Sequence, residues 1–233
     1  MDNTTPILLV PGLLSSPRIF APILPALWRV ASVTVANHTR DDNIGAIARR
    51  ILEEAPPRFA LAGHSMGGYI AFEIIRQAPE RVTRLALMNT QARPDTPELT
   101  ARRRDQMARA KAGNFRDVLN ELFQIFVHPM RRDRADLLQL VHDMGQDVGV
   151  EAFIRQQNAI IARPDSRPTL ATITCPTLVL TADQDKTIPN SLSKEMADGI
   201  RGAKLVVISQ CGHLPQPEQP EATANALIEW LRR

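Results

Sequence analysis

Residues 63–68 read Gly63-His64-Ser65-Met66-Gly67-Gly68 and stand directly between an apolar run at residues 59–62 and an amphipathic run at residues 66–77. They match the pattern G-x-S-x-G, which places a serine on a sharp turn from a strand into a helix. At a helix N-terminus, the dipole and the free N–H groups favour a developing negative charge. The segment therefore predicts Ser65 as a nucleophile above a parallel sheet.

Around this turn, short apolar runs alternate with amphipathic runs, which predicts a mostly parallel sheet flanked by helices, an α/β fold. The expected strands cover residues 7–10, 33–36, 59–62, 85–88, 177–180 and 205–208. Helices are expected at residues 44–55, 66–77 and 221–231, where apolar side chains follow a helical period.

Residues 91–174 differ from the rest of the chain because they contain no convincing strand. Apolar residues recur there at helical spacing, as at Phe115, Val118, Leu119 and Leu122, so three or four helices are expected. We interpret residues 1–90 and 175–233 as the core and residues 91–174 as an inserted helical cap. The basic clusters at residues 102–104 and 131–132 are interpreted as solvated helix faces.

The composition excludes several classes of protein. The chain has 233 residues, 28 Lys and Arg, 25 Asp and Glu, and a net charge of +3, so no clustered basic stripe predicts a nucleic-acid partner. No apolar run is long enough to predict a membrane span, the N-terminus lacks a basic leader, and two cysteines cannot form a disulfide scaffold. A cytoplasmic protein is expected, and histidine and cysteine spacing predicts no metal site.

A nucleophilic serine needs a base, and the base needs an orienting acid. His213 follows the strand expected at residues 205–208, whereas the other histidines lie in a polar loop, beside Ser65 or in the cap. The acid should follow the preceding strand, where Asp183 and Asp185 are both candidates. The order Ser, Asp, His along the chain suits this architecture, but spacing does not choose between the two aspartates.

These motifs resemble the α/β-hydrolase fold superfamily, in its capped serine-hydrolase or carboxylesterase branch. The matching pieces span nearly the whole chain in order: residues 9–14, 63–68 and 175–180, Asp185 with Pro189, and Gly212-His213 with Glu218 and Pro220. Relatives carry the acid in G-x-x-D with a proline four residues later, so the resemblance favours Asp185, with Ala182 in the glycine position. Asp183 is then expected to cap or brace its loop.

The resemblance implies an α/β-hydrolase fold with a helical cap and a sheet of about six strands, since only six residues precede Ile7 and leave no room for an N-terminal hairpin. It implies a Ser65, Asp185 and His213 triad. The backbone N–H groups of Met66 and Leu13 would form the oxyanion hole.

The expected activity is hydrolysis of a small-to-medium carboxylic ester through an acyl-enzyme, with no cofactor. Residues expected around the substrate are Leu14, Phe123, Phe126, Met130 and Leu214. The alternatives are a carbon–carbon bond hydrolase or lyase on the same fold, and a non-catalytic ligand receptor.

Overall fold

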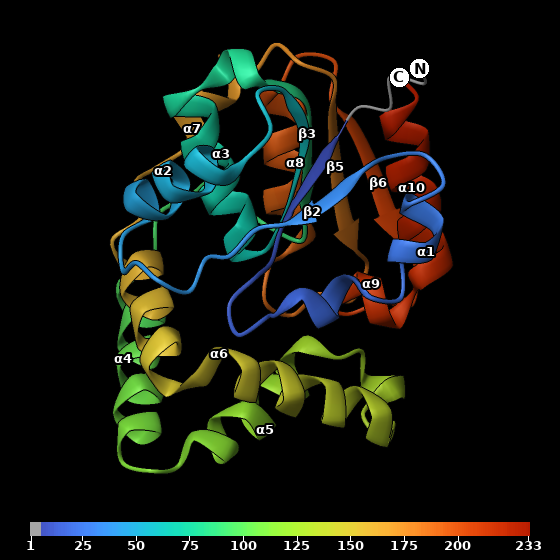
Figure 1. Cartoon of the computed structure of the whole chain (residues 1–233). Helices are drawn as coiled ribbons and strands as arrows, with labels where there is room; N and C mark the ends of the chain where they lie inside the picture. Colours follow the sequence, from blue (N-terminus) through green and yellow to red (C-terminus); the bar gives the residue numbers. More distant parts are fainter. Residues whose placement is uncertain (1–5) are drawn as a thin grey trace.

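The computed structural model describes residues 6–233, and its centre is a six-stranded parallel sheet (Figure 1). The strands run in the order β2-β1-β3-β4-β5-β6, and every neighbouring pair is parallel. They are β1 Ile7–Val10, β2 Val33–Val35, β3 Phe59–His64, β4 Val82–Met88, β5 Thr177–Ala182 and β6 Lys204–Ile208. The predicted fold class and all six predicted strands are confirmed.

Four strands are longer than their apolar runs predict, and of these β5 continues to Ala182 and β6 begins at Lys204. β3 continues through Gly63 and His64 because these residues pair with the end of β4. β4 begins at Val82, where it pairs with Phe59 across a register shift, although Thr83 and Arg84 interrupt the apolar pattern. In β1, β3 and β5 every residue is buried, as expected for strands covered on both faces.

Helices cover both faces of the sheet (Figure 1). The pair α2 and α3 packs on one face, and the pair α1 and α10 lies on the other. Their bounds are α1 Leu24–Leu27, α2 Ile44–Glu54, α3 Met66–Gln77 and α10 Pro220–Leu231, with α8 Asn190–Gly199 and α9 Pro215–Glu218 between β5 and the C-terminus. Short 3-10 turns occur at Pro17–Phe20, Pro79–Arg81 and Pro129–Arg131.

The segment between β4 and β5 contains four helices, α4 Pro97–Lys111, α5 Phe115–Phe126, α6 Ala135–Ile161 and α7 Arg167–Leu170. Helix α6 is interrupted at Gly149, whose φ of 75° and ψ of 166° are not helical. Helices α4, α5 and α6 pack against one another at the carboxyl end of the sheet and form the cap (Figure 1). Helix α7 instead packs against α8, so the inserted segment returns to the core before β5.

Residues 6–233 contain no helix that combines the length and the apolar character needed to cross a bilayer.

Candidate active site

Ser65 stands on a strained turn between β3 and α3. Its φ of 54° and ψ of −115° are unusual for a residue with a side chain. Two close approaches explain the glycines on either side, because a Cβ on Gly63 would collide with the carbonyl of Gly67, and one on Gly67 with the carbonyl of Val10. The Ser65 N–H donates to the Met88 carbonyl at 2.9 Å, and the Thr90 hydroxyl donates to the Ser65 carbonyl at 2.8 Å. These contacts hold the side chain above the sheet.

His213 lies between Ser65 and Asp185, although the three residues come from separate loops. The Ser65 hydroxyl is 2.8 Å from His213 Nε2, and His213 Nδ1–H donates to Asp185 Oδ2 at 2.7 Å. Asp183 lies elsewhere, because its carboxylate accepts the N–H groups of Gln210 at 2.9 Å and Cys211 at 3.0 Å. The structure therefore brings Asp185 to the histidine and gives Asp183 a bracing position in the loop.

Asp185 is surrounded by hydrogen-bond donors. Oδ1 accepts the N–H groups of Thr187 at 2.7 Å and Ile188 at 3.0 Å, and Oδ2 accepts Asn89 Nδ2 at 2.8 Å besides His213. Burial alone would raise the pKa of Asp185, but the interaction with His213 and the hydrogen bonds outweigh it and hold the pKa below its usual range. The carboxylate is thus ionised and fixes the His213 tautomer with Nδ1 protonated.

Asn89 follows β4 and has a φ of 45°, a conformation that asparagine tolerates better than most residues. Sequence reasoning missed it because nothing along the chain links it to Asp185, which is 96 residues away.

His64 supports His213 from the other side. Its Nε2–H donates to the His213 carbonyl at 2.8 Å, and the two ring centroids are 5.2 Å apart. Burial, together with the proximity of His213, lowers the pKa of His64 to about 3, so this imidazole stays neutral at neutral pH. His64 is therefore placed to orient the loop of His213 without adding a positive charge beside it.

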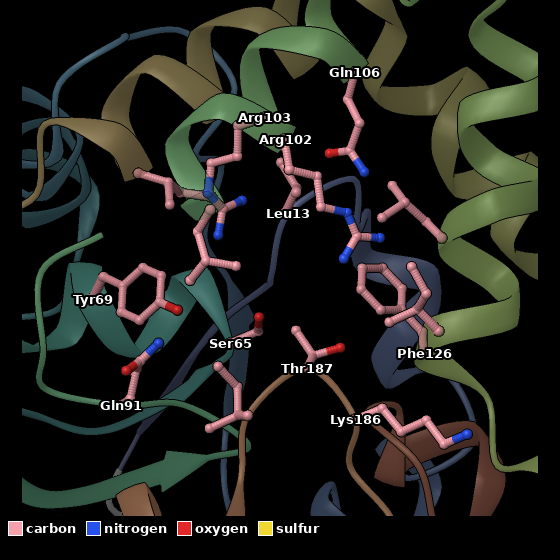
Figure 2. Close-up of a pocket in the computed structure, with 15 residues that line it drawn as sticks. Leu13, Ser65, Tyr69, Gln91, Arg102, Arg103, Gln106, Phe126, Lys186 and Thr187 are labelled. Atoms are coloured by element: carbon pink, nitrogen blue, oxygen red, sulfur yellow. The ribbon is translucent and has the colours of Figure 1, made fainter. Parts of the chain in front are cut away.

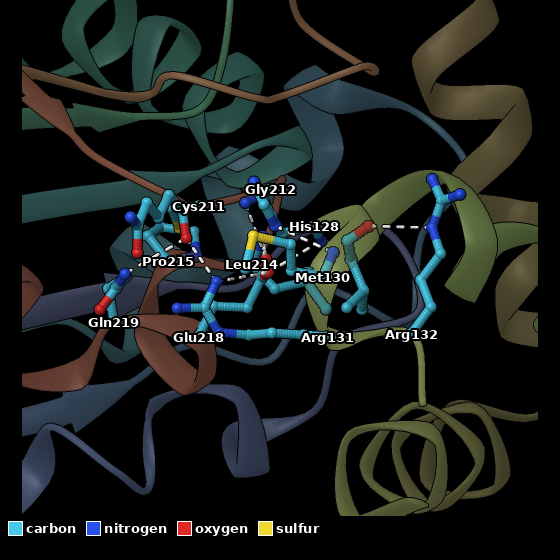
Figure 3. A network of polar contacts seen from close by, with 12 residues as sticks. His128, Met130, Arg131, Arg132, Cys211, Gly212, Leu214, Pro215, Glu218 and Gln219 are labelled. Atoms are coloured by element: carbon cyan, nitrogen blue, oxygen red, sulfur yellow. Dashed lines mark hydrogen bonds and ion pairs between the residues drawn. The ribbon is translucent and has the colours of Figure 1, made fainter. Parts of the chain in front are cut away.

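The loop of His213 is also attached to the cap (Figure 3). Glu218 is buried, and its carboxylate accepts the N–H groups of Gly212 at 3.1 Å, Leu214 at 3.3 Å and His128 at 2.8 Å. The His213 N–H donates to the Phe126 carbonyl at 2.6 Å. Burial raises the pKa of Glu218, against the effect of these N–H groups. The sequence offered Glu218 only as a family match and gave no sign of this link.

The two N–H groups expected to form the oxyanion hole belong to adjacent loops. A Cβ built on Gly12 would be 3.1 Å from Ser65 Cβ, so the loop after β1 packs directly against the turn of Ser65. Among residues 6–233, the N–H groups of Leu13 and Met66 have no hydrogen-bond acceptor. Both are therefore free to bind an oxygen that develops negative charge.

The loop after β1 is held by two residues that sequence reasoning missed. Gln156, from α6, accepts the N–H of Leu14 at 3.0 Å, and Leu14 has a φ of 55°. His38 Nε2–H donates to the Gly12 carbonyl at 2.8 Å. The sequence places His38 in a polar loop, but the side chain is buried, and burial lowers its pKa to about 4.

His38 makes stability depend on pH. Its folded pKa of about 4 lies below the ordinary value of 6.5, so between these values only the unfolded chain binds the proton and acid destabilises the fold. Over this window His38 should lower the unfolding free energy by about 1.4 kcal/mol for each pH unit of acidification. We expect this contribution to be absent from His38→Gln, because glutamine keeps a hydrogen-bond donor but does not titrate. Urea unfolding of both proteins from pH 4.5 to 7 measures the difference. Equal pH slopes would show that His38 does not remain neutral in the fold.

A cavity of about 110 Å³ opens over Ser65 between the cap and the sheet (Figure 2). It is lined by Leu13, Ser65, Tyr69, Gln91, Leu99, Arg102, Arg103, Gln106, Leu122, Ile125, Phe126, Ile160, Lys186, Thr187 and Ile188. Of the residues expected around the substrate, Phe126 lines it.

The other four expected substrate residues lie outside this cavity, which corrects that part of the prediction. Phe123 is 1% exposed and belongs to the buried hydrophobic core, and Met130 is 77% exposed on the turn after α5. Leu14 and Leu214 are buried and do not line the cavity. Helical periodicity identifies which side chains are apolar but not which of them face a cavity.

The cap instead contributes arginines to the cavity. Leu99, Arg102, Arg103 and Gln106 are spaced to share one face of α4, and that face lines the cavity. The interpretation of residues 102–104 as a solvated face holds for the exposed Arg104 and for Arg102, which is exposed although it also lines the cavity, but not for Arg103, which is largely buried and pairs with Asp95. The spacing was visible in the sequence, but polar side chains on a face normally indicate solvent.

Across residues 6–233, no group of three or more His, Cys, Asp or Glu side chains is arranged to hold a metal ion. Near Ser65, the buried atoms His64 Nδ1, Asn89 Oδ1 and Thr187 Oγ1 have no hydrogen-bond partner among these residues.

Several known hydrolases resemble the chain. The sequence model of the alpha/beta hydrolase family matches residues 7–226. A 2-hydroxy-6-oxononadienedioate/2-hydroxy-6-oxononatrienedioate hydrolase from Cupriavidus pinatubonensis is 26% identical over 215 residues, which are 88% of this chain and 73% of that protein.

Two solved structures share the architecture. A thermophilic esterase from Thermogutta terrifontis is 28% identical, with a TM-score of 0.89 and coverage of 98% of this chain and 89% of the other. An enol-lactonase from Burkholderia xenovorans LB400 has a TM-score of 0.89 at 22% identity and covers 100% of this chain and 93% of the other. The second likeness concerns the fold alone.

Proposed function

The chain belongs to the alpha/beta hydrolase family, and from that premise we propose that it is a serine hydrolase cleaving small-to-medium carboxylic esters through an acyl-enzyme. The observation that carries the proposal is the hydrogen-bonded series Ser65, His213 and Asp185 at the floor of a cavity. This arrangement activates a serine by general-base catalysis.

In this proposal, Ser65 Oγ attacks the ester carbonyl while His213 Nε2 accepts its proton. Asp185 stabilises the imidazolium that forms, since its carboxylate already accepts the Nδ1–H of His213. The free N–H groups of Leu13 and Met66 bind the oxyanion of the tetrahedral intermediate. His213 then protonates the leaving alcohol, and a water molecule, activated by the same histidine, releases the acid.

Carbon–carbon bond hydrolysis is the second candidate. The observation in its favour is the likeness to the Cupriavidus pinatubonensis enzyme, whose name describes a hydrolase of 2-hydroxy-6-oxononadienedioate. The same serine, histidine and oxyanion site can serve either chemistry, so the substrate decides between them.

A substrate panel tests the proposal. We expect p-nitrophenyl acetate and p-nitrophenyl butyrate to be hydrolysed, and kcat/KM for the palmitate ester to be lower by about tenfold or more, because the cavity is too small for a long chain. The panel includes 2-hydroxy-6-oxononadienedioate, and mass spectrometry identifies the products. Cleavage of this ketone without ester hydrolysis would favour the second candidate. No turnover, together with no labelling by a fluorophosphonate, would indicate a non-catalytic receptor.

A further inference from the structure

Three basic side chains and no carboxylate line the cavity over Ser65 (Figure 2). Arg102 and Arg103 come from α4 in the cap, and Lys186 directly follows Asp185 in the loop after β5. A cavity lined by charges of one sign attracts a substrate of the opposite sign.

Existing ion pairs leave part of this positive charge uncompensated. Asp95 is shared, since it pairs with Arg103 at 3.2 Å and with Arg163 at 2.8 Å, so two guanidinium groups face one carboxylate. Lysine ion pairs within residues 6–233 are formed by Lys194 and Lys204 and not by Lys186. Arg102 pairs with Glu121 at 3.0 Å, but Glu121 is shared with Arg109, so each of these two carboxylates serves two guanidinium groups and part of the positive charge at the cavity stays uncompensated.

Arg102 is the basic residue best placed to contact a ligand. Its Nη2 donates to Glu121 at 3.0 Å, and Nε and Nη1 have no partner in the described chain. Figure 2 shows its guanidinium reaching from α4 toward the cavity, on the wall opposite Ser65. Free N–H groups of a guanidinium suit a planar carboxylate, which accepts hydrogen bonds through both oxygens.

We propose that the cavity selects substrates with a carboxylate several bonds away from the scissile carbonyl, and that Arg102 binds this carboxylate with help from Lys186. The inference rests on the proposed function, because the scissile carbonyl must lie at Ser65. The polar floor near the serine, with Tyr69 and Gln91, stays available for the uncharged part of the substrate.

Matched ester pairs test this proposal. p-Nitrophenyl hydrogen adipate carries a carboxylate where p-nitrophenyl hexanoate has a methyl group, and m-carboxyphenyl butyrate differs in the same way from m-methylphenyl butyrate on the alcohol side. We expect the anionic member of at least one pair to have a kcat/KM about tenfold higher at low salt. High salt should reduce the preference, because Arg102 is 45% exposed and its charge is screened.

Two arginine variants make the test specific. Arg102→Gln should lower the ratio of anionic to neutral kcat/KM by about three- to tenfold. Arg104→Gln removes the same charge from the same helix, but Arg104 is exposed and does not line the cavity, so the ratio should not change. No anionic preference, or equal effects of the two variants, would overturn the proposal while leaving ester hydrolysis intact.

A binding measurement tests the carboxylate site independently of the proposed ester hydrolysis. Calorimetric titration of the Ser65→Ala protein with monomethyl adipate and with methyl hexanoate requires no turnover. We expect tighter binding of the adipate ester, weakened by Arg102→Gln. Equal binding of the two esters would overturn the carboxylate site whether or not the protein hydrolyses esters.

Discussion

Ser65→Ala is expected to lower kcat/KM for p-nitrophenyl butyrate by about 10⁶-fold, the scale measured when a serine nucleophile is removed from a comparable triad. The reason is that no other group in the site can form the acyl-enzyme, and the oxyanion donors alone give modest acceleration. Stopped assays with purified protein measure the loss. Alanine fits the same turn as serine, so circular dichroism and the unfolding midpoint should be nearly unchanged.

A second serine serves as the control for this substitution. Ser193 in α8 is fully buried, and within residues 6–233 its hydroxyl has no hydrogen-bond partner. Ser193→Ala should leave kcat/KM within about twofold, since Ser193 does not line the cavity and its hydroxyl forms no hydrogen bond to a site residue. If Ser65→Ala were nearly as active as Ser193→Ala, Ser65 would not be the nucleophile.

Asp185→Asn is expected to lower kcat by about 10⁴-fold, as found when the acid of a triad becomes an amide. The carboxylate of Asp185 accepts from four donors, His213, Asn89, Thr187 and Ile188. An amide offers one oxygen, so its NH₂ group must face donors in either orientation. His213 then loses its acceptor or its productive tautomer.

Asp183→Asn provides the matched comparison. Asp183 accepts the backbone N–H groups of Gln210 and Cys211, and the hydrogen bond of His213 goes to Asp185 instead. We expect a loss of about 1–2 kcal/mol in unfolding free energy and less than about a tenfold loss in kcat. Steady-state kinetics and urea unfolding of both variants measure these effects. If Asp183→Asn had the larger loss in kcat, the assignment of the acid would be reversed.

The cap contributes to the site as well as covering it. Gln156 in α6 holds the N–H of Leu14 beside the expected oxyanion donor, and the carbonyl of Phe126 accepts the N–H of His213. Glu218 joins the turn after α5 to the loop of His213 through the N–H of His128. Movement of the cap would therefore shift both the oxyanion loop and the histidine loop.

The strands and Ser65 were predictable because they depend on local patterns. Apolar runs of four residues mark the buried strands, and the glycines around Ser65 are required by close backbone approach within a single turn. His213 could be selected because the order of strands limits which loops reach the serine. The family pattern pointed to Asp185, and the structure brings that residue to His213.

The remaining site residues could not be predicted because tertiary packing alone brings them together. His38 and Gln156 meet the loop after β1 from positions 26 and 142 residues away from their partners Gly12 and Leu14. Leu122 and Phe123 are neighbours on α5, yet Leu122 lines the cavity whereas Phe123 is buried without lining it. That difference depends on how α5 is rotated against its neighbours, which periodicity does not specify.

Reaction with a fluorophosphonate, followed by intact-protein and peptide mass spectrometry, tests most directly whether Ser65 is an activated nucleophile. The hydrogen bond from Ser65 to His213 predicts a single adduct on Ser65, much slower labelling of His213→Gln, and none at this position in Ser65→Ala. An unlabelled wild-type protein, or an adduct on another residue at the same rate in Ser65→Ala, would contradict the proposed mechanism.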